Sequence, residues 1–172
     1  MINLNNHFLN TAYTSNIICD VLDKTCNIET KIKWPNDILI KDKKICGIIT
    51  EIYNKNNETL INTGFGINII SSPKVDYDTT NVNIYNKNID NIKFVYLLMK
   101  QYLSNPNLLK NHSNSILQKY KSRLKYLNKN IKIKLDSNQI KDGFFYDLNK
   151  DGSIIFKNKS SYEKIYNARI LK

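Results

Sequence analysis

The amino-acid sequence predicts an α+β fold: a mixed, mainly antiparallel sheet with packed helices, followed by a small all-β unit at the C-terminus. Three observations favour this class. Residues 12–26 carry apolar side chains at helical spacing, residues 30–69 contain short extended segments separated by turns, and strand-like alternation returns after Asn128. A chain of 172 residues is long enough for one hydrophobic core with a small appendix.

The first predicted helix covers residues 12–26. Its apolar side chains recur on one face while its two aspartates point elsewhere, which is typical of an amphipathic helix. The apolar set is Ile17, Ile18, Val21 and Leu22.

An antiparallel meander is predicted next. Pro35 disfavours helix at Trp34, and turn residues separate the apolar runs that follow. The expected strands are residues 30–33, 38–40, 43–52 and 58–69.

The last of these strands has a useful parity. Its odd positions are mostly apolar and predict a core-facing side, whereas its even positions are small or polar and would let a ligand lie against the backbone. The apolar set is Ile61, Phe65, Ile67 and Ile69, and the small polar set is Asn62, Gly64, Gly66 and Asn68.

The rest of the chain is predicted from periodicity and turn signals. Residues 71–91 are expected to form a surface loop, and residues 92–103 and 115–124 to form helices. The predicted domains are residues 1–125 and residues 126–172.

Composition excludes several classes of protein. No long apolar run or secretory signal is present, so we expect a cytoplasmic protein without a membrane span. The net charge of +11 invites a nucleic-acid hypothesis, but the lysines are scattered, which argues against nucleic acid as a partner. The three cysteines lack metal-binding spacing, so we expect buried free thiols, and both histidines are expected at the surface.

One region concentrates rare residues. The string Lys33-Trp34-Pro35-Asn36-Asp37-Ile38 contains the only tryptophan, Lys44, Gly47 and Glu51 follow, and Gly64-Phe65-Gly66-Ile67-Asn68 comes later. Together these motifs, KWPNDI, KxxGxxxE and GxGxN, resemble the biotin protein ligases. The resemblance implies a partial catalytic domain of the biotin/lipoate ligase type and an SH3-like β-barrel at the C-terminus.

The resemblance also implies an activity. Enzymes of this family, biotin–[acetyl-CoA-carboxylase] ligases, form biotinyl-5′-AMP from biotin and ATP with Mg²⁺. They then transfer biotin to a lysine in the biotin carboxyl carrier domain of a carboxylase.

Site roles are carried over on the matching residues. The resemblance implies that Lys44 contacts the biotin carboxylate and phosphate, with Lys33 and Asp37 as further catalytic candidates on the site floor. Asn36 and Asp37 are candidate Mg²⁺ ligands, and Asp37 is alternatively expected to orient a lysine. The remaining ligand-binding candidates are Gly47, Gly64 and Gly66 for close backbone approach and Asn68 for adenine.

Some features carry alternatives. Trp34 and Pro35 are expected to be core anchors that shape the site, and Glu51 is either a ligand contact or an ion-pair partner. Lys44 and Gly47 have opposite strand parity, so a joint role requires a strand edge, a bulge or a turn nearby.

The chain also departs from the family pattern. No arginine-rich GRGRxGRxW loop is present, and Asn167-Ala168 stands where many members have Gly-Glu. We therefore expect an N-terminally truncated catalytic domain with impaired activity, and an open sheet edge that attracts a complementing N-terminal fragment or a second copy. A non-catalytic module that binds nucleotide or carrier, and a basic nucleic-acid binder, are the alternative functions.

Overall fold

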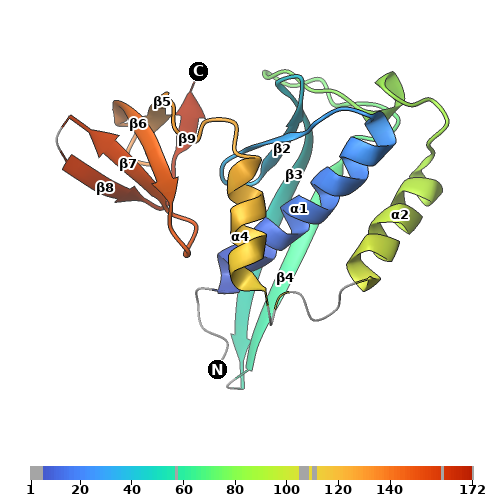
Figure 1. Ribbon diagram of the computed structural model, residues 1–172, viewed down its shortest axis with the longest axis horizontal. Coiled ribbons are helices and arrows are strands. Elements are labelled where there is room, and N and C mark those ends of the chain that lie inside the picture. Colours follow the sequence, from blue (N-terminus) through green and yellow to red (C-terminus); the bar gives the residue numbers. More distant parts are fainter. Residues whose placement is uncertain (1–5, 57, 105–108, 110–111, 160, 172) are drawn as a thin grey trace.

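Two antiparallel sheets and three long helices are found in the computed structural model, which describes residues 6–56, 58–104, 109, 112–159 and 161–171. The helices lie on one side of the first sheet, and the second sheet stands beside them near the C-terminus (Figure 1). The predicted α+β class with mainly antiparallel sheets is confirmed.

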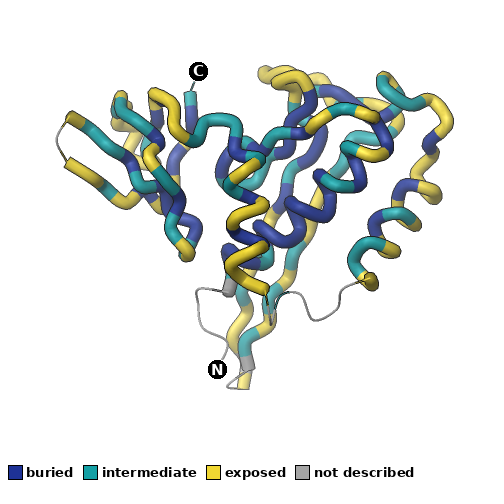
Figure 2. The backbone as a smooth tube through the Cα atoms, in the orientation of Figure 1, coloured by how far each residue is buried: buried dark blue, intermediate teal, exposed yellow. Residues whose placement is uncertain are grey.

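Helix α1 (Asn6–Cys26) crosses the first sheet and is buried along most of its length (Figure 2). It begins earlier than residue 12, because Phe8, Leu9 and Ala12 continue the buried face toward the N-terminus. His7 was expected at the surface, and this expectation was wrong. The histidine is half-buried, and its Nε2 lies 2.9 Å from the Thr50 carbonyl oxygen on the sheet.

The first sheet is a meander with strand order β1-β2-β3-β4. Its strands are β1 (Lys31–Lys33), β2 (Asp37–Ile40), β3 (Lys43–Lys55) and β4 (Glu58–Ile67). The predicted meander is confirmed. Lys41 and Asp42 both adopt positive φ, as a two-residue hairpin turn between β2 and β3 requires.

The strand register assigns the two faces of this sheet. Gly66 pairs with Gly47 and Gly64 pairs with Ile49, so these four residues share one face. Phe65 pairs with Ile48 on the opposite face, which α1 covers through Thr50. The predicted parity of β4 is therefore correct. Phe65 is nevertheless 42% exposed, because β4 is the last strand of the sheet.

Residues 71–91 are not simply a surface loop. Thr80 and Val82 are buried, and a short 3₁₀ helix, η1 (Val82–Ile84), begins at Val82. Thr79 forms an isolated parallel bridge with Lys44 of β3. The prediction failed because the backbone, not an apolar side-chain pattern, fastens this segment to the sheet.

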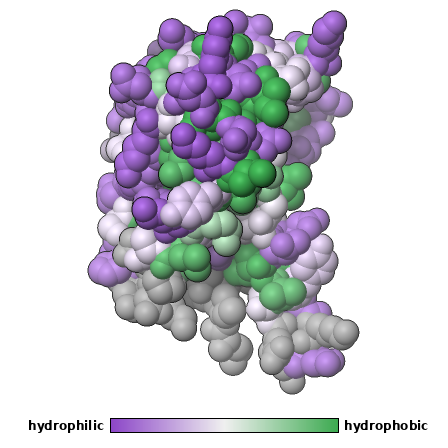
Figure 3. Space-filling model, turned by 90° about the vertical axis from the view of Figure 1, so that its right-hand side faces the viewer, coloured by the Kyte–Doolittle hydropathy of each residue, from purple (hydrophilic) through white to green (hydrophobic). Residues whose placement is uncertain are grey.

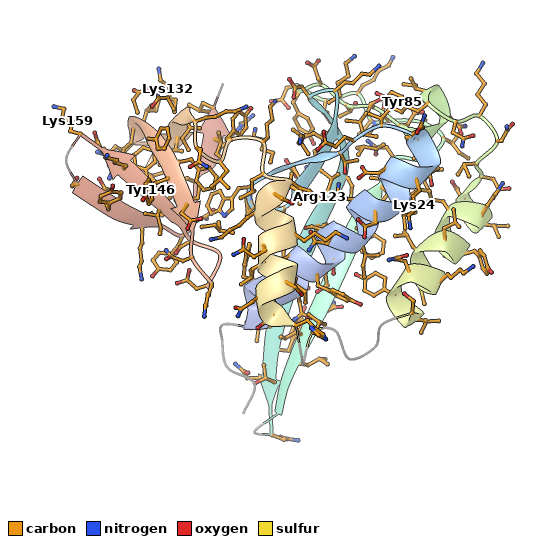
Figure 4. The ribbon with its side chains drawn as sticks, in the orientation of Figure 1. Lys24, Tyr85, Arg123, Lys132, Tyr146 and Lys159 are labelled. Atoms are coloured by element: carbon orange, nitrogen blue, oxygen red, sulfur yellow. The ribbon has the colours of Figure 1, made fainter. Side chains whose placement is uncertain are left out.

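Helices α2 (Asn91–Leu103) and α4 (Ser113–Ser122) flank α1 and agree closely with the predicted ranges. Just after α4, Arg123 reaches back to α1, where it pairs with Asp20 at 2.9 Å and Asp23 at 2.7 Å (Figure 4). His112 precedes α4 and is exposed, as expected. On its outer side α2 exposes several large apolar side chains among polar ones (Figure 3): Ile92, Val95, Tyr96, Met99 and Leu103.

The C-terminal unit is a five-stranded antiparallel sheet of order β8-β7-β6-β5-β9. Its strands are β5 (Asn130–Lys134), β6 (Ile140–Leu148), β7 (Ile154–Asn158), β8 (Ser161–Ile165) and β9 (Arg169–Leu171). In the described residues β8 and β9 do not pair with each other, so the sheet does not close into the expected barrel.

Side chains from α1, the first sheet and the C-terminal sheet share one apolar core. Trp34 contributes its ring to this core and donates its indole N–H to the Gly152 carbonyl at 2.8 Å. Phe8 packs so closely on Gly152 that a Cβ there would lie 2.2 Å from the ring. None of the described helices is long and apolar enough to cross a membrane.

Candidate active site

Lys44 is held by backbone hydrogen bonds on the outer side of the β2–β3 hairpin. Its N–H donates to the Asp78 carbonyl at 2.9 Å, and its carbonyl accepts from the Thr80 N–H at 3.0 Å. The β2–β3 register shifts between Ile38 and Leu39, which pair with Cys46 and Lys44. This bulge brings Lys44 and Gly47 to the same side, as the expected joint role required.

The Lys44 side chain lies over Gly47. Its Nζ is 2.6 Å from Oδ1 of Asp37, and both side chains keep 27% of their surface exposed. A Cβ on Gly47 would lie 3.2 Å from both Cε and Nζ of Lys44. The Tyr77 ring, with its centroid 5.5 Å from Nζ, contacts the ammonium from the loop side.

The loop Trp34–Asp37 is fixed by its own polar groups. The Trp34–Pro35 peptide bond is cis, and the Tyr120 hydroxyl donates to the Pro35 carbonyl at 2.6 Å. Asn36 uses its side-chain amide to donate to the Ile48 carbonyl at 2.7 Å, and its own carbonyl accepts from the Ile48 N–H at 3.0 Å. Trp34 is buried, as expected of a core anchor.

The expected Mg²⁺ site at Asn36 and Asp37 stays a prediction. Asp37 is paired with the Lys44 ammonium, and the Asn36 amide N–H donates to the Ile48 carbonyl. Within the described ranges no group of three or more acidic, histidine or cysteine side chains could hold a metal ion. Of the two predicted roles for Asp37, the geometry favours orienting a lysine.

The glycine face is open on the side away from α1. An added Cβ at Gly64 or Gly66 would meet nothing within 4 Å, so no neighbour among the described residues requires glycine there. Glu51 lies on this face and accepts a hydrogen bond from the Tyr53 hydroxyl at 2.8 Å, not an ion pair. Close approach by a ligand remains a reason for glycine at both positions.

Asn68 lies just past the end of β4, not within the strand as predicted. Its side-chain amide donates to the Thr80 carbonyl at 3.0 Å, and its backbone N–H donates to the Ile45 carbonyl at 2.9 Å. These bonds hold Asn68 next to the segment that fixes Lys44. The Oδ1 atom of Asn68 takes no part in these two bonds.

A cavity of about 800 Å³ opens beside Lys44, a volume typical of small-molecule sites. The cavity brings together Lys33, Asn36, Asp37 and Lys44 from the predicted set, and it leaves out Gly47, Gly64, Gly66 and Asn68. Its other walls were not predicted, because no local pattern connects them to the motif: Val75 to Asp78, Lys125, Tyr126 and Ala168 to Leu171.

Lys125 and Asp42 also line the cavity and form an ion pair, with Nζ of Lys125 2.6 Å from Oδ1 of Asp42. Partial burial opposes the charge on Lys125, but hydrogen bonds with Asp42 and Tyr126 outweigh it and raise the pKa of the ammonium. The cavity therefore contains two lysines, Lys44 and Lys125, that carboxylates hold in place.

Residues 4–68, which carry every predicted site residue, match the model of the Biotin/lipoate A/B protein ligase family. The bifunctional ligase/repressor BirA of Bacillus subtilis is 42% identical over 53 residues, 30% of this chain and 16% of that relative. BirA of Escherichia coli is 35% identical over 54 residues, 31% of this chain and 17% of that relative.

Solved structures extend the similarity across the whole fold. The biotin protein ligase from Aquifex aeolicus superimposes with a TM-score of 0.80 at 19% identity, over 97% of this chain and 76% of that one. The same ligase in complex with biotin and ATP gives a TM-score of 0.78 at 19% identity, over 96% of this chain and 72% of that one. The fold is therefore that of biotin protein ligases, whereas the sequence match to the curated relatives spans less than a fifth of their length.

Proposed function

We propose that this protein is an ATP-dependent biotin protein ligase. It would join biotin to the α-phosphate of ATP and pass the biotinyl group to a lysine of a carboxylase carrier domain. The single observation that carries this proposal is the position of Lys44, fixed at a bulge by backbone bonds on both sides and tethered to Asp37 beside a large cavity. A structure with the same fold holds biotin and ATP.

The first step brings two anions together. A carboxylate oxygen of biotin attacks the α-phosphorus of ATP, the bond to the bridging oxygen of the β-phosphate breaks, and pyrophosphate leaves with the electron pair. Negative charge accumulates where carboxylate and phosphate meet, so a fixed cation there stabilises the transition state more than the ground state. Lys44 supplies this cation, and Lys33 adds positive charge at the cavity wall.

The nucleotide would lie along the glycine face. Gly64 and Gly66 leave the backbone bare on that face, so a flat ligand can approach the sheet closely, and Gly47 makes room for the Lys44 side chain that lies over it. Asn68 would contact adenine through Oδ1, while its amide N–H stays on Thr80.

In the second step the amine of the carrier lysine attacks the acyl carbon of biotinyl-5′-AMP. The carbon–oxygen bond to AMP breaks, and AMP leaves as biotin becomes linked through an amide. The cavity is lined by residues of the first sheet and of β9 and is open to solvent, which leaves a route for a lysine side chain.

An assay of the two half-reactions tests this function. The protein should form biotinyl-5′-AMP from biotin and ATP and should biotinylate a purified carrier domain. Lys44→Ala should lower adenylate formation by about 10²–10³-fold, the typical loss of one preorganised electrostatic contact. Lys43→Ala removes an exposed neighbouring lysine outside the cavity and is the matched control. Absence of adenylate formation by the unaltered protein would refute the function.

A further inference from the structure

A second cavity lies on the C-terminal sheet, apart from the one at Lys44. It has a volume of about 440 Å³, and in the described part of the chain the two cavities share no lining residue. We call the second cavity the outer groove. Strands β5, β6 and β7 and the turn after β7 line it with aromatic, amide and cationic side chains: Asn130, Phe144, Tyr146, Lys157, Asn158 and Lys159.

The register of the sheet aligns side chains of the outer groove across four strands. Asn130 of β5 pairs with Phe144 of β6. Lys157 of β7 pairs with Phe144 on one side and with Tyr162 of β8 on the other. Phe145, the next residue along β6, is completely buried in the core. Because successive side chains of a strand point to opposite faces, the row that contains Phe144 faces solvent.

Two tyrosine rings stand exposed beside this row. Tyr146 is 49% exposed and Tyr162 is 55% exposed. Their ring centroids are 5.2 Å apart and the rings meet edge to face, an arrangement that leaves ring surface uncovered. The Nζ atom of Lys157 lies 5.5 Å from the centroid of the Tyr162 ring. The face therefore offers aromatic surface directly next to a cation.

The two lysines of the outer groove have no carboxylate partner. Lys157 and Lys159 form no ion pair with any residue that the structure describes, and Lys159 lies at the outer end of the sheet (Figure 4). The acid in the described lining, Asp142, lies 3.6 Å from Lys132. Residues 126–172 contain ten lysines and arginines against five acidic residues, a net charge of +5. The groove therefore attracts anions, unlike a cavity whose lysines are paired.

A ligand that suits this face carries both negative charge and flat rings. Single-stranded nucleic acid has both, because its phosphates can meet the lysines while its unstacked bases lie on the aromatic rings. The side-chain amides of Asn130 and Asn158 offer donors and acceptors to the base edges. The bases of a duplex are already stacked on one another, and an acidic peptide would satisfy the lysines but not the rings.

We propose that the outer groove binds single-stranded nucleic acid. Bases would stack on Phe144, Tyr146 and Tyr162, and phosphates would contact Lys157 and Lys159. The lysines are scattered along the sequence, but the strand register brings these two to one aromatic face. Because the groove is separate from the main cavity, this binding would be a second activity of the chain and would not compete with ATP.

Fluorescence anisotropy with labelled oligo(dT) and oligo(U) tests the proposal. Strands of about 12 nucleotides fall within the site sizes of comparable aromatic platforms. Binding of either strand is expected, and a duplex of the same length should bind at least about tenfold more weakly. The double variant Tyr146→Leu/Tyr162→Leu should weaken binding about tenfold or more, since each stacked base contributes substantially. Tyr146→Phe/Tyr162→Phe keeps the rings and should bind almost as well as the unaltered protein.

The charge contribution is measured by the salt dependence. Lys157→Ala/Lys159→Ala should reduce the slope of log affinity against log salt by about 1.4, because each phosphate contact to a single strand contributes about 0.7. Lys150→Ala and Tyr166→Leu are the matched controls, on exposed residues of the same unit outside the groove. Both should leave the affinity unchanged, and circular dichroism checks that every variant is folded.

Three results would overturn the proposal. The first is that the unaltered protein binds neither strand, and the second is that it binds the duplex equally well. The third is that a glutamate peptide displaces the strand at equal concentration, which would assign the groove to acidic peptides. Formation of biotinyl-5′-AMP is measured on the same variants and should be unchanged, so failure of the ligase function and failure of this proposal are distinguishable.

Discussion

Lys44 and Asp37 face each other across the bulged end of the β2–β3 hairpin, with the ammonium 2.6 Å from the carboxylate. The two residues are seven positions apart, and the register shift between Ile38 and Leu39 brings them together. A carboxylate in this position limits the rotamers of a long, flexible side chain. We expect Asp37 to act through the position of Lys44.

Asp37→Asn is predicted to lower adenylate formation by about 10- to 100-fold, because a displaced reacting group is costly even when it is still present. The free energy of unfolding should change by less than about 1 kcal/mol, since partly exposed ion pairs contribute little. Initial rates and urea unfolding measure the two effects. The double variant Asp37→Asn/Lys44→Ala should be no slower than Lys44→Ala alone. A further, multiplicative loss would mean that Asp37 acts independently of Lys44.

Gly47→Ala is predicted to displace the Lys44 ammonium, because the new Cβ would lie 3.2 Å from Cε and Nζ. The flexible end of the lysine gives way more easily than the backbone, so adenylate formation should fall at least tenfold while the fold is retained. Gly64→Ala is the companion variant, since its Cβ enters open space. It should keep or raise the free energy of unfolding, by up to about 1 kcal/mol. If Gly64→Ala also leaves nucleotide affinity unchanged, the glycine face is not a binding surface.

Trp34→Phe is predicted to destabilise the protein by about 1–3 kcal/mol. The variant leaves the buried Gly152 carbonyl without the indole N–H that reaches it at 2.8 Å, and it also reduces the volume of the core. Urea unfolding followed by circular dichroism measures the loss. Tyr166→Phe, on an exposed tyrosine of the same C-terminal unit, should be neutral. A neutral Trp34→Phe would show that the indole bond contributes nothing to stability.

The three thiols are predicted to be unreactive in the native protein. Burial raises the pKa of Cys19 to about 12 and that of Cys26 to about 11, and burial also raises the pKa of Cys46. At pH 8 the native thiolate fraction is therefore very small, and a disulfide reagent should label the cysteines only after unfolding. Rapid labelling of the native protein at pH 8 would contradict this burial.

The same shifts have a consequence for stability. A raised native pKa means that the native thiols bind protons more tightly than the unfolded ones, so their contribution is complete below the ordinary thiol pKa of about 8.5. It is then lost as the pH rises toward 11–12. The free energy of unfolding should fall in that window, and replacing Cys26 by Ser should reduce the slope.

Local patterns were sufficient for most of the site floor. The strands around KWPND, the turn at Lys41-Asp42 and the opposite faces of Phe65 and Gly66 follow from turn chemistry and period-two alternation. Parity required a strand edge, a bulge or a turn near Lys44 and Gly47, and the structure has a bulge there. In each case the residues that interact lie within one hairpin.

Long-range contacts determined what the sequence could not predict. Tyr77 and Arg169 reach the cavity from a loop and from the last strand, and neither carries a local signal that connects it to Lys44. The role of Asn36 as a metal ligand stays a prediction, and the bond by which its amide nitrogen fastens the motif loop to Ile48 was not predicted. An asparagine has the same appearance in sequence whether its amide holds a loop or its oxygen binds a ligand.

The indole of Trp34 connects two parts of the molecule. Trp34 lines the cavity together with Lys33, and its indole N–H donates to the Gly152 carbonyl in the turn between β6 and β7. It is also the only tryptophan in the chain. Its fluorescence therefore has a single origin, at the junction between the motif loop and the second sheet. Emission intensity and wavelength can report nucleotide binding and any movement of that junction without an added label.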